Sequence, residues 1–463
     1  MSGHLEGVCG VSWRGGSSVG SDKALICLDE IRWPKIIKLC TGANVSADLL
    51  GFVGIAAVAI FTLLIARAHP SAAKLLTVAF LIRSAALLGG HYFIALPGSG
   101  DDSLVFQATA IEWSQGGFFL ALSHFTGPDS YFISWLLALI YALTEPSALL
   151  GKSVSLLFGL GTVWMGYLLA KRLWGPRAAV KAGWFVALFP TLILYSALIF
   201  REAYIAFFLV VALYGVVGWA RSGGGLSFGI AMLGFIGATF FHGGMIVGAV
   251  VLLAIIALQA ARRLLKALTY GRVRIVLLGF AFLALTGLGL FVSDAVDVPK
   301  IGTFSEAIDL ERLVEKAQKS TRGSAGYPEW LVPQSPIDLA YVIPIRTVYL
   351  LFSPFPWEVQ SATHLIGVFD GVLYLALAFF LWRHWRAIWA DPASRAIVLI
   401  LAAYFVVFGI ATGNFGTSMR HRAKFVVPLI ALVAPRLKLL RLPTLGQLGL
   451  RRQKTHTRPQ ASH

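Results

Sequence analysis

The stretch Pro97-Gly-Ser-Gly-Asp-Asp102, which continues as Ser-Leu-Val-Phe-Gln-Ala-Thr-Ala-Ile-Glu-Trp113, is an acidic segment that follows a long apolar run. No Lys or Arg occurs between Arg83 and Lys152, whereas five acidic residues do: Asp101, Asp102, Glu112, Asp129 and Glu145. Lys and Arg are retained in the cytoplasmic loops of membrane proteins, so a loop that lacks them is expected on the opposite side. The stretch therefore predicts where the outer face of the protein lies.

The composition is that of a membrane protein with several spans. Of the 463 residues, 57% are hydrophobic and 13% are charged, and the mean hydropathy is +0.76. That much apolar surface exceeds what one soluble core can bury. The net charge of +17 lies mostly in short loops and in the C-terminal tail. There it indicates topology and attraction to anionic headgroups, not binding to nucleic acid.

Apolar runs long enough to cross about 30 Å of hydrocarbon predict an all-α polytopic membrane protein with about eleven transmembrane helices. The runs are 49–66, 75–96, 151–170, 178–198, 203–220, 226–241, 244–261, 273–292, 363–382, 396–412 and the shorter 424–435. Placing the basic loops inside gives a consistent alternation of these spans. We therefore expect a multi-pass protein of the cytoplasmic (inner) membrane.

Three segments are predicted along the chain. They are an N-terminal extension that is expected to be poorly ordered, a transmembrane domain, and a basic cytoplasmic tail, at residues 1–48, 49–435 and 436–463. The transmembrane domain carries two large outer loops, 97–150 and 293–363.

Parts of these loops are apolar or amphipathic but do not fit the alternation as spans. Tyr131–Leu143 is too short to cross a bilayer and is predicted to be an interfacial helix. Leu339–Trp357 contains three prolines and is predicted to be broken or re-entrant. Phe304–Lys319 places its acidic residues at helical spacing and is predicted to be a surface helix.

Carboxylates in and near the first outer loop are the leading candidates for chemistry. Asp101 or Asp102 can act as a general base towards an acceptor hydroxyl, although the same sequence also suits a solvated turn. Arg201 and Glu202 interrupt a long apolar segment. Charges at membrane depth usually face a cavity, which makes Glu202 a catalytic candidate and Arg201 a substrate-binding candidate. The alternative is a hairpin turn at which both charges meet water.

A second group of candidates follows the tenth apolar run. Residues 413–424 hold Asn414 in a Gly-rich turn and then four potential cations, Arg420, His421, Arg422 and Lys424. A basic cluster on the outer face is expected to bind phosphate or pyrophosphate through arginine forks and backbone amides. Pairing with anionic lipid headgroups is the alternative.

Arg346 and Arg322 are further candidates for this anion site, with a structural role as the alternative for each. His242 precedes Gly-Gly at an outer turn, where it either donates to a phosphate oxygen or serves as an ordinary loop residue. The sequence contains no Walker loop, metal-ligand spacing, nucleophile elbow or dinucleotide fingerprint. We therefore expect no cofactor, although the adjacent aspartates leave a divalent metal open.

These features together resemble the GT-C superfamily of integral-membrane glycosyltransferases, which includes protein O-mannosyltransferases and the lipid A aminoarabinose transferase. The resemblance covers residues 75–220: an acidic first outer loop, an interfacial helix, a span that ends in Ala170-Lys-Arg-Leu-Trp-Gly175, and Leu188-Phe-Pro190 ahead of an outer charge. It implies a polyprenyl-phosphate sugar as donor and an acidic catalytic residue in that loop, which maps onto Asp101 or Asp102. Where several relatives carry an Asp, this chain has Arg201-Glu202. Its segment 413–422 is more similar to bacterial exopolysaccharide assembly proteins.

The resulting hypothesis is transfer of a sugar from a polyprenyl-phosphate donor to a glycan or lipid-linked acceptor on the outer face of the membrane. The expected partners are that donor, that acceptor and the lipid bilayer, without nucleic acid. Two other functions stay open at this point. One is a polymerase or ligase of lipid-linked oligosaccharide that depends on Arg and His, and the other is a transporter or flippase of a lipid-linked sugar.

Overall fold

The computed structural model describes residues 45–100, 102–270, 275–295, 297, 302–321, 325–360 and 362–437. The chain divides into two units, Met1–Gly42 and Ala43–His463, and all described residues belong to the second. Within these ranges the regular structure is helical, and Gly326 and Asn414 form an isolated β-bridge. The predicted all-α class is confirmed for this part of the chain. The predicted extension and basic tail fall largely outside the described ranges.

The first half of the unit contains the longest described helix, α7 (Ala148–Trp174), and the two most buried membrane-length helices, α7 and α10 (Arg201–Ser222). They are α2 (Val45–Ala68), α3 (Pro70–Tyr92), α4 (Asp102–Ser114), α5 (Phe118–Ser123), α6 (Phe132–Leu143), α7 (Ala148–Trp174), α8 (Pro176–Leu188), α9 (Pro190–Ser196), α10 (Arg201–Ser222) and α11 (Gly225–Phe241). Helices α7 and α10 form the centre, since most of their side chains are buried against their neighbours. Pro190 begins α9, and α8 and α9 meet at an angle of 61°.

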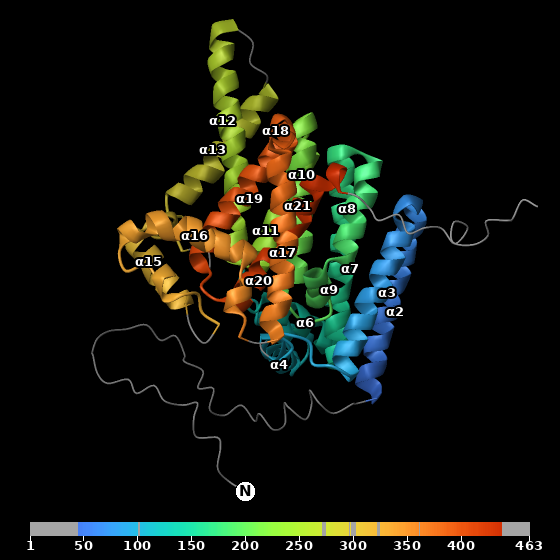
Figure 1. Ribbon diagram of the computed structural model, residues 1–463. Coiled ribbons are helices and arrows are strands. Elements are labelled where there is room, and N and C mark those ends of the chain that lie inside the picture. Colours follow the sequence, from blue (N-terminus) through green and yellow to red (C-terminus); the bar gives the residue numbers. More distant parts are fainter. Residues whose placement is uncertain are drawn as a thin grey trace, which may run out of the picture. The chain divides into compact units, whose positions relative to one another are not determined.

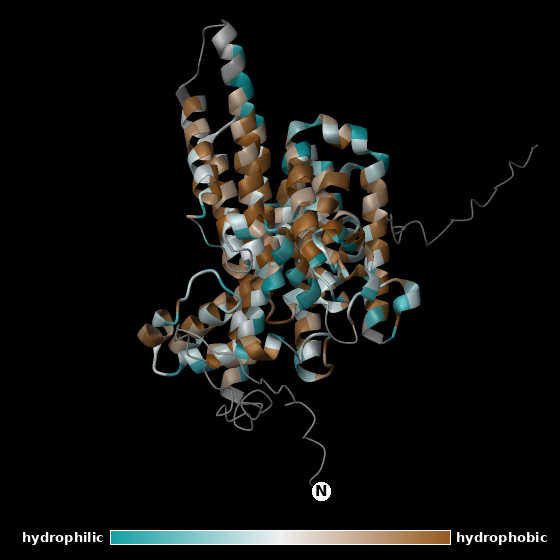
Figure 2. Cartoon of the chain, turned by 90° about the vertical axis from the view of Figure 1, so that its left-hand side faces the viewer, coloured by the Kyte–Doolittle hydropathy of each residue, from teal (hydrophilic) through white to brown (hydrophobic). Residues whose placement is uncertain are grey.

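The second half packs against this centre. Its helices are α12 (Ile246–Tyr270), α13 (Ile275–Val292), α14 (Phe304–Ile308), α15 (Leu310–Ser320), α16 (Leu339–Phe352), α17 (Ala362–Arg383), α18 (Trp385–Ala390), α19 (Pro392–Ala411), α20 (Phe415–Ala423) and α21 (Val426–Val433). It contacts the centre through α19, α20 and α21. Brown, apolar residues dominate the long helices in Figure 2.

Seven of the described helices are long and apolar enough to cross a membrane, and the bent pair α8–α9 raises the number to eight if it counts as one span. These helices correspond to eight of the eleven predicted runs. The other three runs form α11, α13 and α21, of which the described parts count only as shorter apolar helices, Gly225–Phe241, Ala281–Val292 and Val426–Arg436. The chain is therefore a multi-pass helical membrane protein, but the count of eleven spans is not confirmed.

Small residues allow the central helices to approach closely. A Cβ atom on Gly215 of α10 would lie 2.3 Å from the backbone nitrogen of Ala231, and a Cβ on Gly234 of α11 would lie 2.4 Å from that of Ala212. Helix pairs in membranes gain packing contacts through such small residues because lipid supplies no hydrophobic force between helices. The tight α10–α11 pair holds the first turn of α10 in a fixed place.

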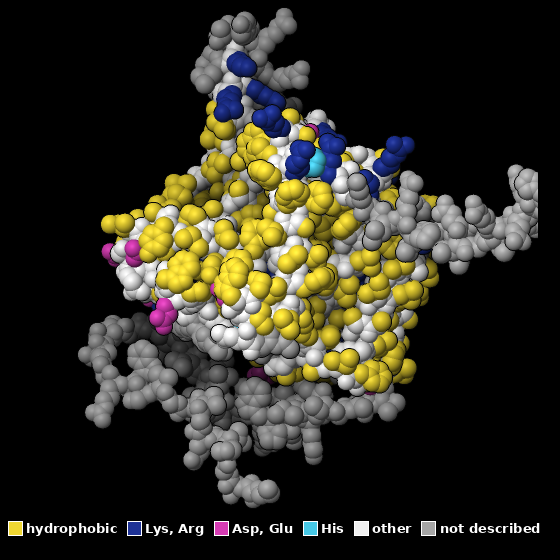
Figure 3. Space-filling model, viewed as in Figure 1, with side chains coloured by type: hydrophobic (Ala, Val, Ile, Leu, Met, Phe, Trp, Pro, Cys, Tyr) yellow, Lys and Arg dark blue, Asp and Glu magenta, His cyan; other side chains and the backbone are white. Residues whose placement is uncertain are grey.

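The two ends of the bundle differ in charge. Lys and Arg gather at the end that carries α8 and α18, whereas α4 and α6 lie at the opposite end (Figures 1 and 3). We call the latter the α4 end. Helices α7, α10 and α17 each have basic residues in their last turn, and all three run towards the basic end.

The segments that were not predicted as spans are short helices. Tyr131–Leu143 forms α6, a 12-residue helix that packs on α4, where the Ser134 hydroxyl donates to the Phe106 carbonyl at 2.9 Å. Leu339–Trp357 is broken, as predicted, but the break comes after α16, which continues through Pro344. The predicted surface helix 304–319 is two helices, because Asp309 adopts an extended conformation and its side chain caps α15.

Candidate functional site

The first turn of α10 places two charged residues inside the protein. Phe200 is extended and ends the loop after α9, and Arg201 and Glu202 begin the helix. Arg201 is 8% exposed and Glu202 is 3% exposed. The helix N-terminus favours the carboxylate because its amide dipoles point positive charge towards it. These two charges therefore face the protein interior and do not simply meet water at a turn.

Arg420, on α20, joins two distant carboxylates. Its Nη1 donates to Asp102 Oδ2 at 2.7 Å, and its Nε lies 3.4 Å from Glu202 Oε1. Its guanidinium also lies over the Phe200 ring, 4.5 Å from the centroid. Burial on its own lowers the pKa of Arg420, but the charges of Glu202 and Asp102 outweigh burial and raise the pKa above its ordinary value. Arg420 is therefore a permanent cation held between two acids.

Two histidines lie beside this cluster. The His242 ring is 5.4 Å from the His421 ring, and both pack on Phe408 of α19. His242 Nδ1 accepts from the Gly244 amide at 3.1 Å, and His421 Nδ1 lies 2.8 Å from Lys424 Nζ. An ammonium group can only donate, so Nδ1 of His421 is an acceptor. When either ring is neutral, its proton is then on Nε2.

These groups line one cavity of about 470 Å³ at the α4 end. Its lining residues come from α4, α10, α15, α19, α20 and the turn before α12: Asp102, Arg201, Glu202, His242, Gly244, Lys316, Val407, Phe408, Ala411, Thr417, Arg420 and His421. The lining holds three cations, two carboxylates and two imidazoles. Such a cavity can bind an anion and also accept a proton from a neutral group.

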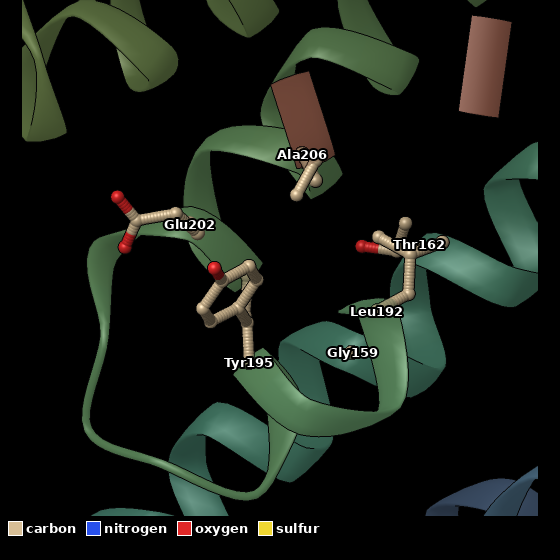
Figure 4. Close-up of a pocket in the computed structure, with 8 residues that line it drawn as sticks. Gly159, Thr162, Leu192, Tyr195, Glu202 and Ala206 are labelled. Atoms are coloured by element: carbon tan, nitrogen blue, oxygen red, sulfur yellow. The ribbon is translucent and has the colours of Figure 1, made fainter. Parts of the chain in front are cut away.

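A second, much smaller cavity lies behind Glu202 (Figure 4). Tyr195 and Thr162 line it together with small apolar side chains. Glu202 lines both cavities, and its Oε2 atom is buried without a hydrogen-bond partner among the described residues. One oxygen of the Glu202 carboxylate therefore accepts no hydrogen bond from the described residues.

The other predicted binding residues are not brought to the charged cavity. Arg346 is fully buried and donates to the carbonyls of Ala317, Leu331 and Thr412 and to the Ser320 hydroxyl. Burial lowers its pKa to about 10. Its observed partners are all groups of the chain itself.

Arg422 is also fully buried. Its Nε donates to Asp370 Oδ2 at 2.6 Å, and its remaining donors contact the carbonyls of Leu351, Ser353 and Gly367. Asp370, itself 1% exposed, accepts a second bond from Thr191. This ion pair joins α9, α17 and α20 away from the cavity.

Asn414 and Lys424 lie at the two ends of α20. The Asn414 side chain accepts from the amides of Gly416 and Thr417 and so caps the helix. Lys424 is fully buried, and its ammonium group lies 2.8 Å from His421 Nδ1 and 5.0 Å from the centroid of the Phe408 ring, both of which line the cavity. Asp101 and Arg322 lie outside the described residues, so the structure assigns them no place.

Several lining residues were not predicted. Lys316 belongs to an amphipathic outer-loop helix, where a lysine is usual and gives no signal of its own. Phe408 and Val407 sit in an ordinary apolar run. Asp370 did have a signal, because it is an acid in the apolar segment 364–383, and such residues usually have a defined partner.

Within the described ranges, no group of three or more His, Cys, Asp or Glu side chains is placed to hold a metal ion. Asp102 and Glu202 both point to Arg420, which already supplies a positive charge between them.

No protein-family model matches the chain, and no curated protein matches it. A solved structure is similar, that of the archaeal oligosaccharyltransferase AglB from Archaeoglobus fulgidus in complex with an inhibitory peptide and a dolichol-phosphate. The TM-score is 0.43 and the identity is 15%, over 80% of this chain and 50% of that chain. The chain thus spans about half the length of this relative. A similarity this distant determines neither the family nor the activity of the chain.

Proposed function

We propose that the protein is a membrane glycosyltransferase that moves a sugar from a polyprenyl-phosphate donor to a glycan or lipid-linked acceptor on the outer face of the cytoplasmic membrane. The observation that carries this proposal is the meeting of Asp102, Glu202 and Arg420 in one cavity. These residues are separated by up to 318 positions in the sequence. The cavity also lies at the end of the bundle away from the basic loops, where the positive-inside rule places the outer face.

In the proposed reaction the acceptor hydroxyl attacks the anomeric carbon of the donor as the bond from that carbon to the phosphate oxygen breaks. Asp102, which is partly exposed at the cavity wall, takes the hydroxyl proton. The departing phosphate keeps the bonding electrons, and Arg201 and Arg420 stabilise its growing negative charge. Glu202 holds Arg420 in position. Attack from the opposite side inverts the anomeric centre, and no step requires a metal.

Arg346 and Arg422 receive no substrate contact in this proposal, since their observed hydrogen bonds go to groups of the chain. Positioning accounts for much of the remaining rate, because both substrates are amphiphiles that one cavity must orient together.

The test is a transfer assay with purified protein in lipid nanodiscs and a radiolabelled polyprenyl-phosphate sugar. Release of free polyprenyl phosphate that depends on an acceptor is the expected result. The Asp102→Asn variant is expected to lower kcat by about 10²–10⁴-fold, the usual loss when a general base is removed. Glu112→Gln is the matched control, because Glu112 is an exposed carboxylate on the same helix.

A second function, polymerisation or ligation of lipid-linked oligosaccharide, is favoured by the contact of His242 and His421 beside Arg420. In that case Asp102→Asn keeps full activity and His421→Ala does not. Movement of the labelled lipid across the membrane without release of polyprenyl phosphate would instead identify a transporter.

A further inference from the structure

A large apolar groove adjoins the charged cavity. Its volume is about 670 Å³, and it lies between α12, α13, α14, α15 and α19. Val247, Val250, Phe291 and Ile410 are among the side chains that form its wall. These residues belong to the first turns of α12 and to the last turns of α13 and α19. The groove is therefore level with the charged cavity, at the α4 end of the bundle.

The groove and the charged cavity share part of their walls. Lys316, Val407 and Ala411 line both. An extended ligand with an apolar part and a polar part can therefore occupy both spaces at once. The charged side of this junction is cationic, because Lys316, Arg201 and Arg420 all line the cavity beyond it.

The position of Lys316 is fixed by the buried residues that follow it. Ala317 packs in the interior, and its carbonyl accepts from Arg346 at 3.2 Å. The same guanidinium donates to the Thr412 carbonyl, at the end of α19, at 2.7 Å. Arg346 thus holds α15 against α19 and keeps Lys316 at the junction. This gives a physical role to an arginine that the sequence had suggested as a substrate contact.

Lys316 is partly removed from water at the junction. The side chain is half-buried, and this burial lowers its pKa below the ordinary value. A phosphate oxygen beside the ammonium group would stabilise its charged form.

We propose that this groove holds the isoprenoid chain of the lipid-linked substrate and that Lys316 contacts the phosphate of that lipid at the junction. This inference rests on the proposed function, since it adds the path of the lipid to the same site. The occupant follows from two observations. The groove is lined mainly by hydrocarbon, and it leads into a cavity whose cations match a phosphate. The sugar beyond the phosphate then lies among Asp102, Glu202 and Arg420.

The first experiment measures binding independently of catalysis. Purified protein in phosphatidylcholine vesicles is irradiated with a polyprenyl phosphate that carries a photoreactive group on its chain, and the labelled peptides are identified by mass spectrometry. Labels are expected on α12, α13, α15 or α19. Lys316→Ala is expected to reduce labelling by about tenfold, the scale of a lost charge-assisted contact, whereas Lys316→Arg retains it. Lys319→Ala is the control, because Lys319 lines the groove but not the charged cavity.

The second experiment narrows the groove. Val250→Trp is expected to raise the KM for a long-chain donor by about tenfold through lost hydrocarbon burial, and to leave a short-chain donor unaffected. Leu283→Trp is the matched control, because Leu283 is an exposed residue of α13 outside the groove lining.

Three results would overturn the inference. They are labels confined to other helices, equal effects of Val250→Trp on long and short donors, and complete loss of labelling when ordinary phosphatidylglycerol is in excess, which would mark a general lipid site. Labelling of the groove without any sugar transfer would leave the groove assignment standing and refute the proposed enzyme. Sugar transfer with the same KM for long-chain and short-chain donors would refute the groove assignment and leave the proposed enzyme standing.

Discussion

Arg420 and Arg422 are two residues apart on α20, and their surroundings are opposite. Arg420 lines the charged cavity, keeps 22% of its side chain exposed, and contacts Asp102 and Glu202 from distant segments. Arg422 is fully buried and contacts Asp370 and backbone carbonyls. Residues two positions apart on a helix project about 200° from each other. One short helix therefore presents one arginine to the cavity and the other to the core.

The comparison shows that donor use, not charge, distinguishes a candidate binding arginine from a structural one. A guanidinium has five donor hydrogens. All three nitrogens of Arg422 are engaged by groups of the chain. Among the described residues, Arg420 has partners at Nη1 and Nε and makes no hydrogen bond through Nη2. Arg420 therefore retains both hydrogens of Nη2 for a phosphate oxygen, whereas Arg422 uses four of its five donor hydrogens within the chain and is fully buried.

The largest expected effect is the loss of stability in Arg422→Ala. Removing one partner of a buried ion pair leaves the other charge buried alone, which costs about 3–5 kcal/mol. The physical cause is the uncompensated charge of Asp370 together with the loss of the hydrogen bonds from Arg422 to three carbonyls. Thermal unfolding in detergent, followed by size-exclusion chromatography, measures the shift. Arg420→Ala is the control, and equal stability of the two variants would contradict the distinction between core and cavity.

The second effect is on catalysis and concerns Arg420. Arg420→Ala is expected to lower kcat by about 10²–10³-fold, the loss found when one donor to a developing oxyanion is removed. Arg420→Lys should recover only part of the activity, since lysine supplies a point charge without the planar fork. Steady-state kinetics of the transfer reaction provide the measurement, with unfolding midpoints of both variants alongside. Full activity in Arg420→Ala would remove this residue from the mechanism.

Much of the fold was predictable because apolar periodicity and length set membrane helices directly. Eight of the predicted runs became helices, or a bent pair of helices, that are long and apolar enough to cross a membrane. The prediction was less accurate where packing decides the outcome. Run 226–241 does form a helix, the 17-residue α11, and run 424–435 forms the 8-residue α21; both are shorter than the counted spans and lie against longer neighbours. Sequence hydropathy reports the residues of a segment and does not report what covers them.

The candidate site was predictable in part for the same reason. Arg201 and Glu202 were found because charges in apolar sequence are costly and need partners. The different directions of Arg420 and Arg422 were not predictable, because the partner that decides them, Asp370, is 52 residues away from Arg422. Lys316 was missed since a lysine on an amphipathic helix has no local signature, and only the arrangement of α15 beside α19 brings it to the cavity.

The smallest expected effect concerns the hydrogen bond from Thr191 that supports the buried ion pair between Arg422 and Asp370. Thr191 donates its hydroxyl to Asp370 Oδ1 at 3.1 Å, on the side of the carboxylate away from Arg422. Thr191→Val keeps the shape and removes this bond, which should cost about 1.5 kcal/mol because the acceptor is charged. Thr62→Val is the control, since the Thr62 hydroxyl bonds only a carbonyl of its own helix. Unfolding midpoints and kcat are measured together, and kcat should not change in either variant. A fall in kcat without a fall in stability would mean that the Arg422–Asp370 ion pair contributes to catalysis. The distinction between a structural Arg422 and a substrate-binding Arg420 would then be wrong.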